Sequence, residues 1–225
     1  MKRKMQNPWL QIPAEDYEGH MSAPNVAQLQ MLNKIFADVL EKFHPQSIAI
    51  LGCTTGNGFE HLTDKNIEWI VGVDINPKYI SICKKRFRKN LSQLKLVCAD
   101  LNEINFPDSS FDLIHAALVF EYVEVEPLLS KISHWIKRDG ILSVVLQLPG
   151  KAASPVSETP YQSMKLLNPY MKLVKLEEFR DNAQKYGLEE IKNFKVEMNS
   201  GKSFSEIIFK QNKVGAQPAC GRHVY

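Results

Sequence analysis

The sequence has few of the features that mark membrane, secreted or metal-binding proteins. It contains four cysteines, and no two of them have the C-x-x-C spacing of a zinc site or a redox dithiol. No apolar run approaches the roughly 20 residues of a transmembrane helix, and no signal-peptide core follows the basic N-terminus. We therefore expect a cytoplasmic protein without a metal site or a membrane partner.

The sequence also lacks a strong charge of either sign. Its 28 basic and 25 acidic side chains leave a formal net charge of +3, and no long basic face is apparent. Hydrophobic residues make up 44% of the 225 residues and charged residues 24%, as in ordinary globular proteins. We expect one domain with a substantial core and no nucleic-acid partner, and the oligomeric state stays open.

The most informative segment is residues 47–59, an apolar run that breaks into a loop with glycines at positions 52, 56 and 58. A second apolar run, Trp69–Val73, ends in Asp74. A strand, a glycine-rich turn, a helix and a strand that ends in a carboxylate form the βαβ arrangement that binds a nucleoside cofactor. A carboxylate at this place can accept charge-assisted hydrogen bonds from paired ribose hydroxyls.

The glycine spacing, G-x-x-x-G-x-G, differs from the G-x-G-x-x-G of nicotinamide dinucleotide sites. It resembles the first motif of the class I S-adenosylmethionine-dependent methyltransferases, in which an acidic residue and any residue precede G-x-G-x-G. Gly52 and Gly56 match the outer glycines of that motif. Thr54 replaces the middle glycine, and Ile50 stands where the acidic residue is common.

Two later segments extend the resemblance. Residues 100–112 are similar to the family's D-x-x-x-L-P-F-x-D-x-S-F-D stretch, and residues 136–142 to its L-K-P-G-G-x-L turn. The chain is identified as a member of this class, similar to the small-molecule methyltransferase domains 11 and 25. The resemblance implies an α/β fold with a Rossmann-like, seven-stranded, mostly parallel sheet, helices on both faces and a C-terminal antiparallel hairpin.

The apolar pattern predicts the elements in order. Residues 1–21 are expected to be irregular. Strands are expected near 47–52, 68–74, 94–99, 111–116 and 141–148, with a terminal hairpin of 189–198 and 203–210. Helices are expected to begin at Ser22, Asn57 and Pro77 and to cover about 126–137 and 175–186. The single domain, 1–225, divides into a lid and helix (1–45), a cofactor-binding core (46–148), a substrate-side insertion (149–174), a helix and hairpin (175–212) and a tail (213–225).

The resemblance implies that S-adenosylmethionine is the cofactor and that it lies beyond the carboxyl ends of the strands. Asp74 would hold the ribose, and Asp100 would contact the adenine amino group. The residues expected around the cofactor are Tyr17, Gly52, Cys53, Thr54, Gly56, Asn57, Gly58, Asp74, Ile75, Asp100, Leu101 and Ala116.

Methyl transfer from a sulfonium is a direct displacement, for which a protein mainly aligns the nucleophile and excludes water. Residues 118–123 are similar to the family's L-H-H-V or L-E-H-V stretch, with Glu121 and Tyr122 at its polar positions. We name Glu121, Tyr122 and His20 as candidate catalytic residues. Alternatively, Glu121 caps the next helix, Tyr122 packs beneath it, and the segment around His20 is a surface arm instead of a lid.

We therefore expect an S-adenosylmethionine-dependent methyltransferase that acts on an unidentified small molecule. Two alternatives stay open. Ile50 and Thr54 suggest a protein that binds the cofactor with weak or no catalysis, and a methyltransferase for RNA or protein is the other alternative. The sequence does not distinguish nitrogen, oxygen, sulfur or carbon as the acceptor atom.

Overall fold

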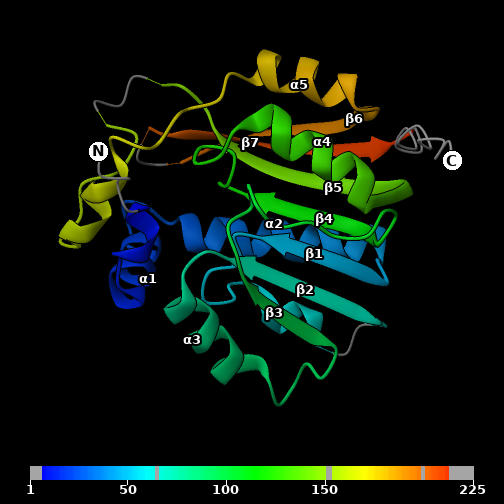
Figure 1. Ribbon diagram of the computed structural model, residues 1–225. Coiled ribbons are helices and arrows are strands. Elements are labelled where there is room, and N and C mark those ends of the chain that lie inside the picture. Colours follow the sequence, from blue (N-terminus) through cyan, green and yellow to red (C-terminus); the bar gives the residue numbers. More distant parts are fainter. Residues whose placement is uncertain (1–6, 64–65, 151–153, 199–200, 213–225) are drawn as a thin grey trace, which may run out of the picture.

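A computed structural model describes residues 7–63, 66–150, 154–198 and 201–212. One seven-stranded sheet crosses the molecule in the order β3-β2-β1-β4-β5-β7-β6 (Figure 1). Only β7 runs antiparallel to its neighbours, so the expected fold class and terminal hairpin are confirmed. The strands are β1 (Ser47–Leu51), β2 (Trp69–Asp74), β3 (Leu94–Cys98), β4 (Phe111–Ala117), β5 (Ile136–Gln147), β6 (Leu188–Glu197) and β7 (Ser203–Gln211).

Helices cover both faces of the sheet. The α-helices are α1 (Ala14–Ser22), α2 (Gln28–Phe43), α3 (Pro77–Phe87), α4 (Val125–Trp135) and α5 (Leu176–Lys185), and the 3-10 helices are η1 (Pro8–Leu10), η2 (Phe59–Leu62) and η3 (Gln162–Leu167). Along β1, Ile48 and Ile50 pack with α2 and α3, whereas Ala49 and Leu51 pack with α4 and α5. Parallel strands are apolar on both faces because both are covered in this way.

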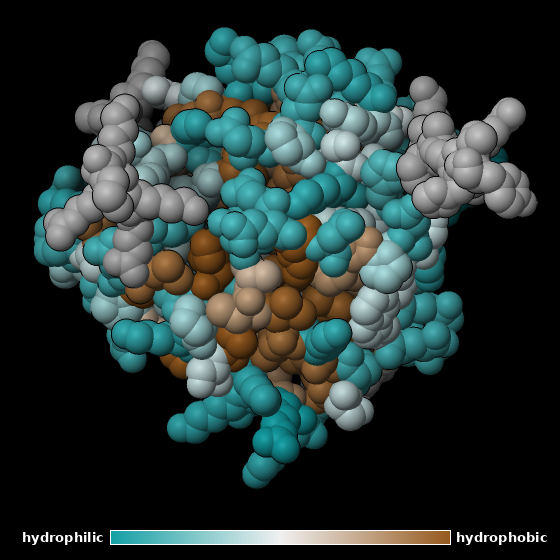
Figure 2. All heavy atoms as spheres, in the orientation of Figure 1, coloured by the Kyte–Doolittle hydropathy of each residue, from teal (hydrophilic) through white to brown (hydrophobic). Residues whose placement is uncertain are grey.

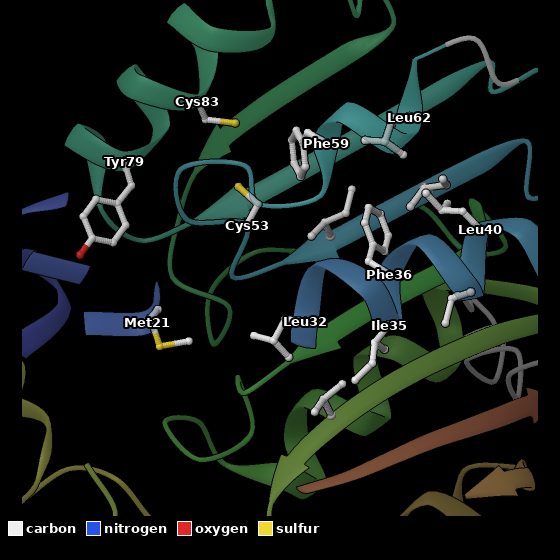
Figure 3. Packing of buried hydrophobic residues seen from close by; sticks show 14 of the residues in the cluster. Met21, Leu32, Ile35, Phe36, Leu40, Cys53, Phe59, Leu62, Tyr79 and Cys83 are labelled. Carbon is white, nitrogen blue, oxygen red and sulfur yellow. The ribbon is translucent and has the colours of Figure 1, made fainter. Parts of the chain in front are cut away.

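The core on the α2 side is drawn in Figure 3, where Leu32, Ile35 and Phe36 project from α2. On the other face, the connection between β3 and β4 contains no helix. Figure 2 shows hydrophobic side chains gathered in the middle of this face, with hydrophilic side chains around them. Within the described ranges, each helix is too short or too polar to cross a lipid bilayer.

The N-terminal region differs from the expectation. It is not irregular, because residues 14–22 form α1, and α2 begins at Gln28 instead of Ser22. The Ser22 hydroxyl donates to the carbonyl oxygen of Glu18 at 2.7 Å, so it belongs to the end of α1 and does not cap α2. Such a short helix is stabilised by tertiary burial, here of Tyr17 and Met21, which a sequence pattern does not reveal.

Two further element boundaries were wrong. No α-helix opens at Asn57, whose side chain instead donates to the carbonyl oxygen of Leu29 at 3.0 Å, and only η2 follows. β5 begins at Ile136, five residues before the expected start, because Ile136 pairs with Phe111 before the register shifts. Of the expected hairpin connection, 199–202, residues 199–200 lie outside the described residues, as does the tail, 213–225.

Candidate functional site

A crevice lies at the carboxyl ends of the strands, where open α/β sheets bind ligands. Gly52 follows β1, Asp74 ends β2, Asp100 follows β3, Leu118 follows β4 and Gln147 ends β5, and all five line it. The empty volume, including the part open to solvent, is about 1080 Å³.

The glycine-rich loop forms one wall of the crevice. Gly52 has φ +69°, and a Cβ atom there would lie 2.7 Å from Cγ2 of Val119, so only glycine fits without displacement. Thr54 also has a positive φ, of 48°, which is unfavourable for a β-branched residue. Its backbone N–H donates to Oδ2 of Asp74 at 2.9 Å, which ties the loop to the end of β2.

Asp74 is buried at the centre of this wall. Its Oδ1 accepts a second backbone hydrogen bond, from the N–H of Asn76 at 2.8 Å. Burial raises the pKa of Asp74 to about 6, while backbone hydrogen bonds from Asn76 and Thr54 oppose the rise. A carboxylate offers about four acceptor positions, so these two bonds leave capacity for ligand hydroxyls.

The next part of the crevice combines a carboxylate with apolar side chains. Asp100 accepts hydrogen bonds at Oδ1 from the backbone N–H of Asn102 at 2.8 Å and from its side-chain amide at 2.9 Å. Leu101, which follows Asp100 in the sequence, and Ile75, which follows Asp74, both line the crevice. An apolar slot beside a hydrogen-bond acceptor suits a purine that carries an exocyclic amino group.

The N-terminal segment forms part of the crevice wall. Trp9 of η1 and Tyr17 of α1 both line the crevice, and Trp9 packs edge-on against Tyr122 with ring centroids 5.0 Å apart. Tyr17 lies beside Tyr79 of α3, with ring centroids 5.6 Å apart. The Tyr79 hydroxyl donates to the carbonyl oxygen of Ile12 at 3.1 Å. The segment therefore packs against the rest of the chain and is not a free surface arm.

The other end of the crevice lies near β5 and β7 and has polar side chains among apolar ones. Nδ1 of His20 is 2.9 Å from Oγ1 of Thr159, and the Lys202 ammonium donates to the carbonyl oxygen of Pro155. Burial lowers the pKa of His20 to about 4, and the nearby charge of Lys202 acts in the same direction. Gln147 also lines this end. The sequence analysis named neither Lys202 nor Gln147 as a site residue. Lys202 was missed because a lysine in a hairpin is usually solvated.

The structure brings most, but not all, of the expected site residues together. Of the expected cofactor and catalytic residues, the crevice is lined by Tyr17, Gly52, Thr54, Asp74, Ile75, Asp100, Leu101, His20 and Tyr122. The residues outside its lining are Cys53, Gly56, Asn57, Gly58, Ala116 and Glu121.

The glycines and cysteine outside the lining shape the loop from behind. A Cβ atom at Gly56 would lie 2.6 Å from Cε2 of Phe87, and one at Gly58 would lie 2.9 Å from Cδ1 of Phe36. Their positive φ angles, +91° and +85°, add a backbone requirement for glycine. Cys53 is buried, and its sulfur is turned towards α3 (Figure 3). These residues allow the loop to pack on α2 and α3.

Glu121 is fully buried outside the crevice lining. Its Oε1 accepts a hydrogen bond from the backbone N–H of Gln147 at 2.7 Å, and burial raises its pKa to about 7. Oε2 has no hydrogen-bond partner in the part of the chain that the structure describes. Glu121 also does not cap α4, whose N-cap residue is Glu124. The Oε1 atom therefore holds the end of β5 through Gln147.

Comparison with known proteins agrees with this architecture. Residues 50–144 match the profile of a family described as a methyltransferase domain. The phosphoethanolamine N-methyltransferase of Triticum aestivum is 24% identical over 121 residues, which are 52% of this chain and 24% of the relative. The matched part thus spans about a quarter of the length of that relative.

Solved structures share the fold. The N-methyltransferase NodS from Bradyrhizobium japonicum WM9, in complex with S-adenosyl-L-homocysteine, superposes with a TM-score of 0.63 and 14% identity, over 84% of this chain and 89% of NodS. The [4+2]-cyclase SpnF superposes with a TM-score of 0.65 and 15% identity, over 80% of each chain. At these identities the likeness shows the fold alone, and the methyltransferase match concerns residues 50–144.

Proposed function

We propose that this chain, a member of the class I S-adenosylmethionine-dependent methyltransferases, transfers a methyl group to a small-molecule nucleophile. One observation carries the proposal: a single crevice has Asp74 and Asp100 at one end and His20 and Lys202 at the other. We assign the first end to the cofactor and the second end to the acceptor. When bound, S-adenosylmethionine supplies an electrophilic methyl carbon for a direct displacement.

The residues at the first end suit the parts of this cofactor. We propose that the free acceptor positions of Asp74 hold the ribose hydroxyls and that Asp100 accepts from the adenine amino group. Ile75 and Leu101 would contact the apolar faces of the base. The absence of a side chain at Gly52 lets the ligand approach the backbone, which supports the same assignment.

The protein's own contribution to the reaction is alignment and the exclusion of water. The aromatic side chains of Trp9, Tyr17 and Tyr122 pack on one another and line the crevice. His20 is neutral at pH 7 because burial lowers its pKa to about 4, which makes it a weak base. We propose that His20 and Tyr122 orient the acceptor through hydrogen bonds, and that the acceptor arrives with a free lone pair.

The covering of the crevice supports a small acceptor. α1 and η3 both contribute lining residues, Met21 and Met164 among them, so the second end is walled by local segments. A concave and mostly apolar site of this kind suits a small molecule better than a nucleic acid or a protein chain. The relative from wheat is named as a phosphoethanolamine N-methyltransferase, and phosphoethanolamine is a small molecule.

The test is a label-transfer experiment. Purified protein is incubated with methyl-labelled S-adenosylmethionine and, in separate reactions, with pooled small metabolites, tRNA and a protein mixture. We expect label in small molecules only, and none with Asp74→Ala, which loses the proposed ribose acceptor. Label confined to tRNA or protein would refute the small-molecule acceptor.

A second candidate is a protein that binds the cofactor without transferring its methyl group. Ile50, which stands in place of the usual acidic residue, is buried in the core and offers no acceptor. SpnF, described as a [4+2]-cyclase, has the same fold. Binding of S-adenosylhomocysteine in calorimetry, with no label transfer to any acceptor pool, would favour this candidate.

A further inference from the structure

Lys202 is an unusual residue for a hairpin, because its side chain is buried. The residue is 6% exposed and lines the crevice, whereas Lys195 in the same hairpin has a 58% exposed side chain paired with Glu197. The Lys202 ammonium donates one hydrogen bond, to the carbonyl oxygen of Pro155. An ammonium has three donors, so this bond leaves two for other acceptors.

The charge of Lys202 has no acidic partner among the described residues. None of the ion pairs in this part of the chain includes it, and the acidic crevice residues Asp74 and Asp100 lie at the other end, beyond β2 and β3. Burying an ammonium without a counter-ion is costly, and a hairpin lysine could avoid this cost by pointing into water. Burial lowers the pKa of Lys202 to about 8, which leaves it mostly protonated at pH 7.

Other polar groups lie at the same end of the crevice. The Ser157 hydroxyl is buried and has no hydrogen-bond partner within the described ranges, although Ser157 lines the crevice. The Gln147 side-chain amide donates to the carbonyl oxygen of Pro155 at 3.0 Å, next to the bond from Lys202. The cation and the hydroxyl are both suitable partners for an anion.

We propose that the acceptor substrate carries an anionic group, a carboxylate or a phosphate, that pairs with the Lys202 ammonium and accepts a hydrogen bond from the Ser157 hydroxyl. This inference rests on the proposed function and names its substrate class. The ion pair offsets the desolvation of the ammonium. It also discriminates against neutral analogues, because they leave the buried charge unpaired.

The first experiment measures anion binding without catalysis. Protein saturated with S-adenosylhomocysteine is titrated with orthophosphate or acetate in a calorimeter, against a background of constant ionic strength set with chloride. We expect at least one anion to bind, Lys202→Met to weaken it tenfold or more, and Lys195→Met to leave it unchanged. If neither anion binds, or if Lys202→Met binds them as the wild type does, the proposal is wrong.

Two control measurements establish where the anion binds. Ser157→Ala is expected to weaken anion binding several-fold, and it serves as the test if Lys202→Met does not fold. S-adenosylhomocysteine itself is expected to bind Lys202→Met with the wild-type affinity. A tenfold loss there would assign Lys202 to the carboxylate of the cofactor and overturn the substrate role.

The second experiment identifies the labelled product by mass spectrometry after incubation with pooled metabolites. A product with a carboxylate or phosphate, whose formation Lys202→Met slows mainly through a higher KM, supports the proposal. A product without an acidic group refutes it and leaves the methyltransferase function intact. If no product forms, the proposed function fails, and the anion titration still decides the role of Lys202.

Discussion

The Glu18 carboxylate of α1 forms an ion pair with the Arg86 guanidinium near the end of α3, and its second bond, from Nη2 to Oε2, is 3.0 Å long. Glu18 also accepts a hydrogen bond from the Thr55 hydroxyl in the glycine-rich loop. The hydrogen bond from Arg86 lowers the pKa of Glu18. This cluster ties the N-terminal segment to the loop that we propose binds the cofactor.

Replacing Arg86 with methionine is expected to loosen α1. The pair is partly exposed, so the free energy of unfolding is expected to fall by at most about 1 kcal/mol. Amide hydrogen exchange in residues 14–22 is expected to accelerate, and the affinity for S-adenosylhomocysteine to fall several-fold. The matched control is Lys34→Met, which removes an exposed pair with Asp38 on α2. Unchanged exchange in α1 would show that the pair does not hold the segment.

Gly56→Ala is expected to destabilise the fold more than it affects the ligand. Gly56 has a φ of +91°, and an added Cβ atom would lie 2.6 Å from Cε2 of Phe87. The substitution is therefore expected to lower the free energy of unfolding by roughly 1–3 kcal/mol. Because Gly56 is outside the crevice lining, folded protein should retain most of its affinity for S-adenosylhomocysteine. Urea denaturation and calorimetry measure the two effects. Gly150→Ala, where a Cβ atom meets nothing within 4 Å, is the control.

Cofactor affinity is expected to depend on pH through Asp74. Burial raises its pKa to about 6, so the carboxylate is charged at pH 7.5 and becomes protonated as the pH falls through 6. Since the charged form is the better acceptor, calorimetry with S-adenosylhomocysteine should show affinity falling between pH 7 and 5. Asp74→Asn should bind about 1.5–3 kcal/mol more weakly at pH 7.5 and show little pH dependence in this range. An equal slope in both proteins would exclude Asp74 as the titrating group.

Glu121→Gln is expected to change the pH dependence of stability. The native pKa of about 7 exceeds the ordinary value of 4.5, so the native state binds more protons between these values. The wild type therefore loses stability as the pH rises from 4.5 to 7, and this loss is complete above 7. The glutamine variant does not lose stability in this way, so its stability relative to the wild type should rise by on the order of 3 kcal/mol from pH 4.5 to 8.

The same variant tests whether Glu121 takes part in catalysis. Because its carboxyl group is buried outside the crevice lining, turnover in the label-transfer assay is expected to stay within a few-fold of the wild type. Loss of turnover in a folded variant would restore the catalytic role that the sequence suggested.

The sequence by itself determined the sheet and the place of its carboxylates. The apolar runs and the motifs at residues 52–58, 74 and 100–112 predict the strands and put Asp74 and Asp100 at their carboxyl ends, where the structure has them. Such features are local, because strand length, turn chemistry and motif spacing are written in neighbouring residues.

Only the tertiary structure decided which side chains reach the crevice. The sequence placed Gly56 and Glu121 at the site, and both lie outside the crevice lining, whereas Lys202 carries no motif and lines the crevice. The physical reason is that burial and pairing arise between segments far apart in the sequence. The Lys202 bond to Pro155, for example, joins residues separated by 47 positions.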